Sequence, residues 1–298
     1  MDKAFSELDH RQVRRQFTRA VPTYAAAAVL AREVERRMLE RLDYVKIDPT
    51  CIVDAGCGLG AGLRELGRRY PGAQRIGVDV AGAMLRGALN GVTLQQRARA
   101  FFGGNSVQLV CADMRALPLA DGGGDLLWSN FGLAFAGEPQ AALREFARVL
   151  KPGGLLMFSA YGPDTLRELR SAFAAAGTHA HVHDFTDMHD LGDMLSANGF
   201  ATPVMDMEML TLTYRDARAL ALDLRASGQT NALAARHHGL TGKARWRRMA
   251  EAYERLRAPA GGTLPASFEV VYGHAWKIAP RSPGTAVVKL DFPSRRKS

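Results

Sequence analysis

The residues best placed for chemistry are acids that follow short apolar runs, and the first of them stands before a turn rich in glycine. Asp54 ends such a run, and Gly56, Gly58 and Gly60 follow it at alternate positions. A glycine turn after a buried strand lets a ligand lie directly against the backbone, because no Cβ intervenes. The helix predicted over 61–70 directs its first amides to the same place and favours a carboxylate or phosphate there.

Two further acids follow apolar runs in the same way. The second run ends in Asp79, and a carboxylate at the end of a strand can accept both hydroxyls of a ribose. A third run, 107–111, is followed by Asp113 and Met114, which can accept an adenine amino group and pack on the adenine ring. A fourth run occupies 125–130. These runs predict successive strands with ligand-binding groups at their ends.

The glycine turn alone does not identify its ligand. Read as G-x-G-x-x-G/A, Gly56, Gly58 and Ala61 also satisfy the fingerprint of dinucleotide-binding proteins. The acids that end the later runs decide the matter, because they offer separate partners for a ribose and an adenine. Single residues also have structural explanations: a strand-end cap for Asp54, a helix N-cap for Asp79, core packing for Met84 and a small filler for Cys57.

Composition narrows the class of protein. The chain has 298 residues, enough for one sizeable α/β domain with additions. No apolar run reaches the ~18 residues of a membrane span, and the first residues lack the apolar core of a secretion signal. The three cysteines form neither a disulfide framework nor a zinc site, and the histidines from His179 to His189 lack the spacing of a zinc protease helix. We therefore expect a cytoplasmic protein with no metal and no membrane partner.

The order of predicted elements divides the chain into four parts. They are an N-terminal helical lid (1–45), a core that carries the glycine turn (46–160), a C-terminal part of the sheet with a helical insertion (161–278) and a flexible tail (279–298). In the lid, Phe17, Ala20 and Tyr24 have helical spacing, and Pro22 is expected to break or kink the helix. Tyr24 either folds over the ligand or is simply half-buried.

The second half of the chain alternates predicted helices and strands. The Lys-Pro-Gly-Gly turn at 151–154 precedes a fifth strand, and Asp164 is expected to cap a helix through residue 175. The remaining elements are a helix over 187–197, a strand pair or one long strand over 200–213, two or three basic helices over 215–257 and a last strand over 268–276. An insertion before the last strand lies over the carboxyl ends of the strands, so it is the natural element of substrate specificity.

Positive charge gathers in the last third of the chain. The net charge is +9, and basic residues outnumber acidic ones after Asp206. A basic face can attract an acidic partner, either nucleic acid or an acidic carrier protein. The other interpretation is a solvated helix surface. Nucleic acid is disfavoured, because the chain lacks a separate RNA-binding module and aromatic residues interleaved with basic ones.

The ordered motifs resemble those of the class I S-adenosylmethionine-dependent methyltransferases. The resemblance covers residues 50–159 and implies a Rossmann-like α/β fold: a seven-stranded, mostly parallel sheet with helices on both faces, an N-terminal helical lid and a helical insertion before the last strand. In that family the first acid and the glycine turn hold the methionine part, the second acid the ribose and the third the adenine. The residues implied to bind S-adenosylmethionine here are Tyr24, Asp54, Gly56, Cys57, Gly58, Gly60, Asp79, Val80, Met84, Asp113, Met114, Asn130 and Leu133.

Motifs outside the core narrow the resemblance. Residues 17–20 with Tyr24, 128–130, 143–145 and the closing run 268–276 are similar to the malonyl-acyl-carrier-protein O-methyltransferases of biotin synthesis. This resemblance implies methyl transfer to the free carboxylate of a malonyl thioester. The partner it implies is malonyl-acyl-carrier protein, an acidic protein that would suit the basic insertion.

A second resemblance leaves an alternative function open. Residues 162–170, 190–195 and 228–231 are similar to the mitochondrial complex I assembly factor, which has a methyltransferase fold and is associated with arginine hydroxylation. The chain would then act on a protein arginine or as an assembly factor. Two other hypotheses are an idle methyltransferase fold that serves as a scaffold and an RNA-binding methyltransferase, the latter suggested by the charge alone.

The expected chemistry requires positioning more than proton transfer. A malonyl carboxylate is already ionised at pH 7, so attack on a methyl sulfonium needs no general base. The planar fork of an arginine matches a carboxylate, and Arg167 and Arg170 are the candidates, because their predicted helix starts beside the end of the fifth strand. They can also be ordinary solvated arginines. Asn130, Phe131 and Leu133 are expected to line the methyl-transfer pocket.

Overall fold

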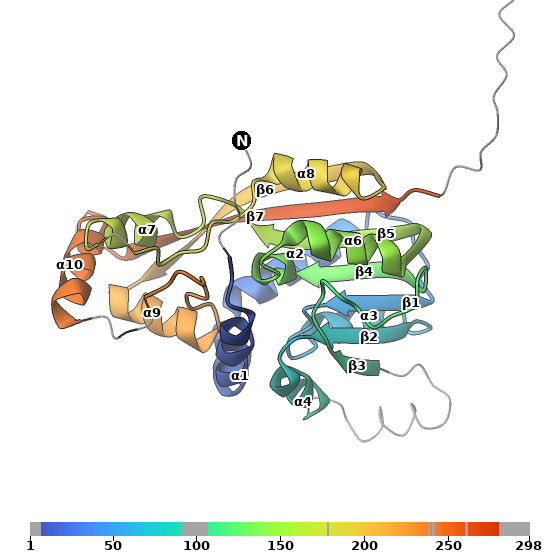
Figure 1. Cartoon of the computed structure of the whole chain (residues 1–298), viewed down its shortest axis with the longest axis horizontal. Helices are drawn as coiled ribbons and strands as arrows, with labels where there is room; N and C mark the ends of the chain where they lie inside the picture. The colour runs from blue at the N-terminus through green and yellow to red at the C-terminus, as the bar shows by residue number, and fades with distance from the viewer. Residues whose placement is uncertain are drawn as a thin grey trace, which may run out of the picture.

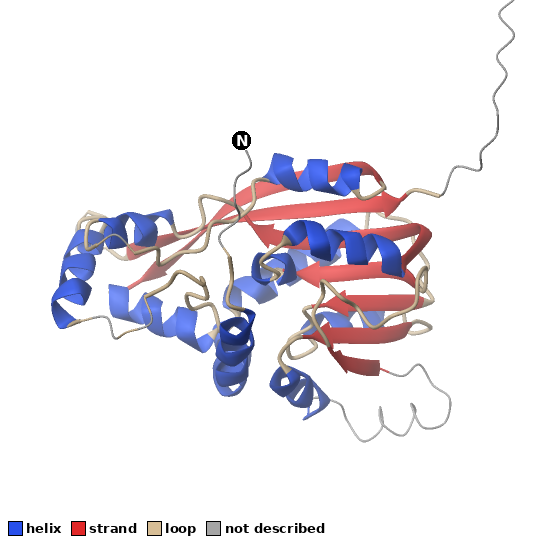
Figure 2. Cartoon of the chain, in the orientation of Figure 1, coloured by secondary structure: helices blue, strands red, loops and turns tan. Residues whose placement is uncertain are grey.

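In the computed structural model, the described residues are built around a seven-stranded sheet (Figures 1 and 2). The structure describes residues 7–90, 107–177, 179–237, 239, 242–259 and 262–279. The strand order is β3-β2-β1-β4-β5-β7-β6. The strands are β1 Cys51–Ala55, β2 Gln74–Asp79, β3 Val107–Cys111, β4 Gly124–Asn130, β5 Leu150–Tyr161, β6 Phe200–Tyr214 and β7 Leu264–Lys277. The predicted seven-stranded sheet is confirmed.

The direction of the strands creates a crevice at one edge of the sheet. Strands β1 to β5 pair in parallel, while β7 lies antiparallel between β5 and β6. The chain proceeds outward from β1 through β2 to β3, and it then returns to place β4 on the other side of β1. In such doubly wound sheets, ligands bind where the strand order reverses, outside the carboxyl ends of the strands. Asp54 lies near the carboxyl end of β1, Asp79 ends β2 and Asp113 follows β3, so these acids lie at this edge.

Alternating residues of the central strands pack the sheet on both faces. On one face Ile52 packs with residues of α2 (Val29–Leu42) and α3 (Ala61–Arg69), whereas its neighbour Val53 packs with residues of α6 (Pro139–Val149) and α8 (Met188–Ala197). Successive side chains of a strand point to opposite faces of the sheet, which explains why one apolar run packs into two separate clusters. Helices on both faces were predicted, and the arrangement is confirmed.

The N-terminal helices cover the crevice. Helix α1 (His10–Ala27) begins at Asp9, whose carboxylate accepts the backbone N–H of Arg11 and Gln12. Of the break or kink expected at Pro22, the break does not occur, because the helix runs through Pro22 and ends at Ala27; α2 begins at Val29. Helix α1 packs against α4 (Gly82–Asn90) on one side and α9 (Ala217–Ala226) on the other. Helix α1 therefore contacts both the core of the fold and the helical insertion.

Strands β6 and β7 extend beyond the end of β5. Residues 264–269 of β7 pair only with β6, since β5 pairs with residues 270–276. Helices α7 (Arg167–Ala174), α9 and α10 (Lys243–Glu254) gather around this extension on the left of Figure 1. Residues 200–214 form one long strand, and the basic insertion contains two helices among the residues described. All but the first residue of the predicted tail lie outside the described residues.

Two local predictions were wrong for tertiary reasons. Asp164 does not cap α7, which begins at Arg167 after Leu166 with a φ of 55°. The backbone N–H of Leu166 donates instead to the carbonyl of Ser267 at 2.6 Å, so the strand β7 sets the start of the helix. The turn at 151–154 lies inside β5, where the register against β4 shifts.

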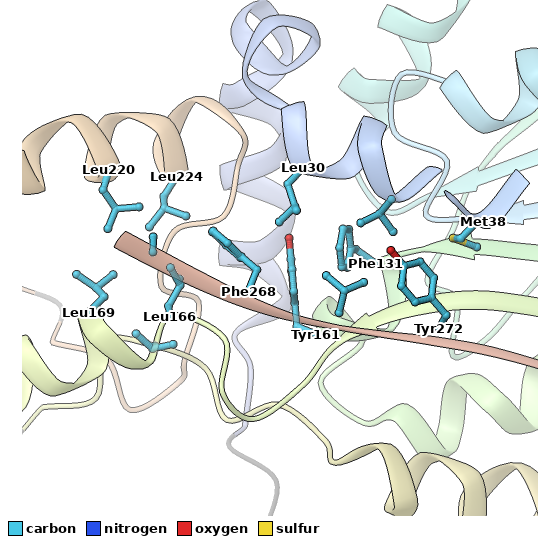
Figure 3. Packing of buried hydrophobic residues seen from close by; sticks show 14 of the residues in the cluster. Leu30, Met38, Phe131, Tyr161, Leu166, Leu169, Leu220, Leu224, Phe268 and Tyr272 are labelled. Atoms are coloured by element: carbon cyan, nitrogen blue, oxygen red, sulfur yellow. The ribbon is translucent and has the colours of Figure 1, made fainter. Parts of the chain in front are cut away.

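The apolar core continues from the sheet into the insertion. Figure 3 shows Phe131 and Tyr161 near the sheet, with Leu220, Leu224 and Phe268 along the same cluster. Of the helices described, none has the length and apolar character needed to cross a bilayer.

Candidate active site

A cavity of about 230 Å³ opens at the carboxyl ends of the parallel strands. Its floor comes from the turns after β1, β2, β3 and β4, and its cover comes from α1 and α2. Ten of the predicted ligand-binding residues line this cofactor cavity: Tyr24, Asp54, Gly56, Cys57, Gly58, Asp79, Val80, Asp113, Met114 and Asn130. The topology therefore brings together acids that are far apart in the sequence.

Backbone conformation and close neighbours both favour glycine at this site. Gly56 and Gly58 have φ values of 86° and 52°, which L-residues with a Cβ rarely adopt. A Cβ on Gly56 would lie 3.2 Å from the Cα of Gly132. On Gly62, in the first turn of α3, a Cβ would lie 2.8 Å from Glu35 Oε1 and 2.9 Å from Asp54 Oδ2. Backbone and carboxylates therefore face the space that a ligand would fill.

Two backbone N–H groups hold the carboxylate of Asp79 in place. Its Oδ2 accepts the backbone N–H of Gly58 at 2.9 Å, and its Oδ1 accepts that of Ala81 at 2.8 Å. Burial raises the pKa of Asp79, and the two backbone hydrogen bonds oppose that rise. Each carboxylate oxygen keeps acceptor capacity for a hydroxyl. The bond to Ala81 and the expected role as a ribose acceptor are thus compatible.

The part of the cavity that follows β3 contains an ion pair. Asp113 Oδ2 lies 2.7 Å from Arg115 Nη2. Burial acts to raise the pKa of Asp113, but the hydrogen bonds and charge of Arg115 outweigh it, and the pKa is lowered. The carboxylate is therefore ionised and fixed in orientation. Met114 lines the cavity beside it, as expected for a thioether that packs on a ring.

A buried glutamate that the sequence reasoning missed completes the site. Glu35 of α2 accepts a hydrogen bond from Trp128 Nε1 at 2.9 Å and another from Asn130 Nδ2 at 2.7 Å. Burial raises its pKa to about 7. Burial also raises the pKa of Asp54 well above its ordinary value, and the nearby Glu35 and Asp79 carboxylates add to that rise. Among the described residues, neither Glu35 nor Asp54 forms an ion pair with a basic side chain.

The amide of Asn130 is engaged within the protein. Its Nδ2 donates to the carbonyl of Ala31 and to Glu35, and its Oδ1 accepts from Ser159 Oγ at 2.8 Å. Ser159 Oγ in turn accepts the backbone N–H of Phe131, which has a φ of 57°. This network fastens α2 to the end of β4. Asn130 therefore shapes the cavity wall, and its side chain has little capacity left for a substrate.

Other predicted site residues lie outside the cavity lining. Gly60 precedes α3, Met84 of α4 is buried against α1, and Leu133 is buried in the short helix that follows β4. The structure thus favours the core interpretation of Met84. Tyr24 lines the cavity, and burial raises its pKa to about 12.

Neither arginine expected to hold the substrate reaches the cavity lining. Arg167 is exposed and lies 3.5 Å from both Asp164 and Glu168. Arg170 donates to the carbonyl oxygens of Pro163 and His183, at 2.9 and 3.0 Å. It therefore ties together two loops. The spacing of these arginines on a helix gave no information about which neighbours their guanidinium groups would meet.

The cavity suits a ligand with both polar hydroxyls and positive charge. Asp79 and Asp113 offer acceptors to a ribose and an adenine, and the carboxyls of Glu35 and Asp54 lie beside Gly62, where no basic side chain of the described residues forms an ion pair with them. S-adenosylmethionine carries a ribose, an adenine, an ammonium and a sulfonium, so the residues present fit it. Sequence reasoning could have found Glu35 from its place on the apolar face of α2, one position after Val34 and three before Met38.

Comparisons with known proteins agree with this site. A family described as a methyltransferase domain matches residues 53–158. The YcgJ protein of Bacillus subtilis aligns with a TM-score of 0.56 at 16% identity, over 82% of this chain and 99% of that one. A putative methyltransferase of Bacillus halodurans gives the same values. The fold and the site thus define a class I methyltransferase, whose methyl donor is S-adenosylmethionine.

Relatives with higher identity identify the family. A malonyl-[acyl-carrier protein] O-methyltransferase of Gallionella capsiferriformans is 50% identical over 287 residues, 96% of this chain and 97% of its own. Another, from Nitrosospira multiformis, is 49% identical over 282 residues, 92% of this chain and 91% of its own. The chain belongs to the malonyl-[acyl-carrier protein] O-methyltransferase family.

Proposed function

We propose that this chain transfers a methyl group from S-adenosylmethionine to the free carboxylate of malonyl-acyl-carrier protein, an early step of biotin synthesis. The observation that carries the proposal is the similarity to the enzymes of that name over nearly the whole chain, insertion included. The relatives do not favour the alternative of an assembly factor acting on a protein arginine. The scattered cysteines suit a cytoplasmic setting, which is also part of the proposal.

The protein contributes position and enclosure to the reaction. S-adenosylmethionine supplies a methyl group on a positively charged sulfur. Asp79, Asp113 and the glycine turn would hold its adenosine, while Glu35 and Asp54 would face its cationic part. Phe17 and Tyr24 of α1 close the cavity against water, and a dry site strengthens electrostatic alignment. The substrate carboxylate is ionised at pH 7, so the chain needs no general base.

The basic face of α10 supports an acidic protein partner. Arg247 and Arg248 are exposed on this helix, and Arg245 lies against Gly177, just after the end of α7. Among the described residues, Arg247 pairs with Glu251 at a long distance of 3.7 Å. A basic surface of this kind speeds the capture of an acidic partner. We propose that the carrier protein docks here.

Product analysis with matched carriers tests the proposed function. Purified protein is incubated with methyl-labelled S-adenosylmethionine and with malonyl-, succinyl- or acetyl-carrier protein. We expect label on malonyl-carrier protein, in a form that mild base releases as methanol, and none on acetyl-carrier protein, which lacks a free carboxylate. Equal labelling of unrelated proteins, or no labelling of malonyl-carrier protein by a chain that binds the donor, would refute the proposal.

A further inference from the structure

A second cavity, of about 440 Å³, lies in the C-terminal part of the chain. Its walls come from α7, α9, α10 and the loop before α8. Most of its lining is apolar, including Leu169, Phe173, Leu220, Leu224, Trp246 and Met249. Figure 3 shows Leu169 on the α7 side and Leu220 and Leu224 on α9, near the part of β7 that extends beyond β5. The activity described so far does not use this space.

The second cavity shares a wall with the cofactor cavity. Phe135 and Gln229 line both of them. Tyr161 lines the second cavity, and its ring stacks on that of Phe131, which lines the first, with 4.1 Å between the centroids. A ligand in the second cavity would therefore end beside the cofactor cavity, on the side of Gln229.

Gln229 is held in place at this shared wall. Its backbone N–H donates to the carbonyl of Leu224 at 2.7 Å, which closes the C-terminus of α9 in the manner of a Schellman motif. Gly228, with a φ of 74°, makes that turn, and a Cβ there would lie 2.7 Å from the ring of Phe17. Tyr161 OH donates to Gln229 Oε1 at 3.0 Å. The two N–H groups of Nε2 are thus the donors that Gln229 can offer to a ligand.

Two exposed arginines of α9 add positive charge to the lining of the second cavity. Arg218 and Arg225 line it, are exposed, and are seven residues apart on α9, so they lie on one side of the helix. No described residue forms an ion pair with either of them. The cavity thus combines an apolar channel, amide donors at its inner end and cations at its surface. An elongated ligand with an anionic outer end would match all three features.

We propose that the second cavity receives the acylated phosphopantetheine arm of the carrier protein, and that Gln229 orients the acyl carboxylate where the two cavities meet. The inference rests on the proposed function, because that function supplies a substrate carried on such an arm. The phosphate of the arm pairs with Arg218 and Arg225, and the thioester lies against the apolar lining. Gln229 takes the role that the sequence had suggested for Arg167 and Arg170.

A binding measurement tests the channel without relying on methyl transfer. The probe is malonyl-pantetheine 4′-phosphate, titrated into the full chain saturated with S-adenosylhomocysteine. The double variant Arg218→Glu/Arg225→Glu should weaken binding roughly tenfold, since two charge-assisted contacts are lost. Ala221→Trp should abolish binding, because Ala221 lines the cavity and the larger ring fills it. Arg68→Glu, at an exposed arginine of α3, is the control and should leave affinity unchanged.

The same variants separate the two proposals. Affinity for S-adenosylhomocysteine should stay within about twofold in each, which shows that the cofactor cavity is intact. Gln229→Leu should lower kcat for malonyl-carrier protein more than it raises KM. Binding that is absent in the unmodified chain, or equal in the unmodified chain and the double variant, overturns the channel. Failure of the proposed function instead appears as binding of the probe without methylation of malonyl-carrier protein.

Discussion

Replacing Glu35 with glutamine should change how stability depends on pH. The folded chain holds this carboxyl at a pKa of about 7, against an ordinary value of 4.5. The folded state therefore binds the proton more tightly than the unfolded state does. Glu35 contributes most to stability below pH 4.5, and this contribution is lost as the pH rises toward 7. Each pKa unit corresponds to about 1.4 kcal/mol, so the loss amounts to about 3 kcal/mol.

The assay is urea unfolding at a series of pH values from 5 to 8. Between these limits the unfolding free energy of the unmodified chain should fall by about 2–3 kcal/mol relative to that of Glu35→Gln. The glutamine can still accept the hydrogen bond of Trp128. Without the Glu35 charge the pKa of the neighbouring Asp54 is raised less, so Asp54 adds less pH dependence to the stability of the variant. This widens the difference between the unmodified chain and Glu35→Gln.

A glutamate on the same helix provides the control. The pKa of Glu33 is lowered to about 2, mainly by its hydrogen bonds with Arg36 and Arg37. Its contribution to stability is present above pH 4.5 and is lost only as the pH falls toward 2. Glu33→Gln should therefore give a curve parallel to that of the unmodified chain from pH 5 to 8. A parallel curve for Glu35→Gln as well would refute the argument about burial at this site.

Three further variants probe the cofactor cavity and the basic face. Asp79→Ala should weaken S-adenosylhomocysteine binding by about 1–3 kcal/mol in calorimetry, and unchanged affinity would remove the ribose assignment. Gly62→Ala places a methyl group against the carboxyls that line the cavity and should lower the unfolding free energy by about 1–3 kcal/mol in urea; a neutral change would contradict the close packing. Reversing the charges of Arg245, Arg247 and Arg248 should raise KM for malonyl-carrier protein but not for malonyl-coenzyme A. Equal effects on both substrates would exclude docking on α10.

The sequence predicted the parts of the fold that depend on local rules. Asp54, Asp79 and Asp113 each follow an apolar run, and parallel strands must bring their carboxyl ends to one edge, so their convergence on one cavity needed no tertiary knowledge. The glycine turn was equally clear, because the positive φ of Gly56 and Gly58 is a local requirement.

Predictions failed where neighbours from distant segments decide the outcome. The charge and spacing of Arg170 suited a carboxylate, but the carbonyl groups of Pro163 and His183 engage its guanidinium. The spacing of Glu35 from Met38 placed it on the apolar face of α2, but its hydrogen bonds with Trp128 and Asn130 depend on how α2 packs against β4. Gln229 lies in the run 228–231 that resembles the assembly factor, but nothing in that run pointed to this cavity, because the position of Gln229 depends on how α9 ends against α1.

The methyl donor is expected to bind in the cavity at the carboxyl ends of β1 to β4. A crystal structure of the chain with S-adenosylhomocysteine tests it most directly. We expect the ligand in that cavity. Its ribose hydroxyls should donate to Asp79, its adenine should lie near Asp113 and Met114, and its ammonium should lie beside Glu35 and Asp54. A ligand bound elsewhere on the protein, or an adenosine that contacts neither Asp79 nor Asp113, would contradict it.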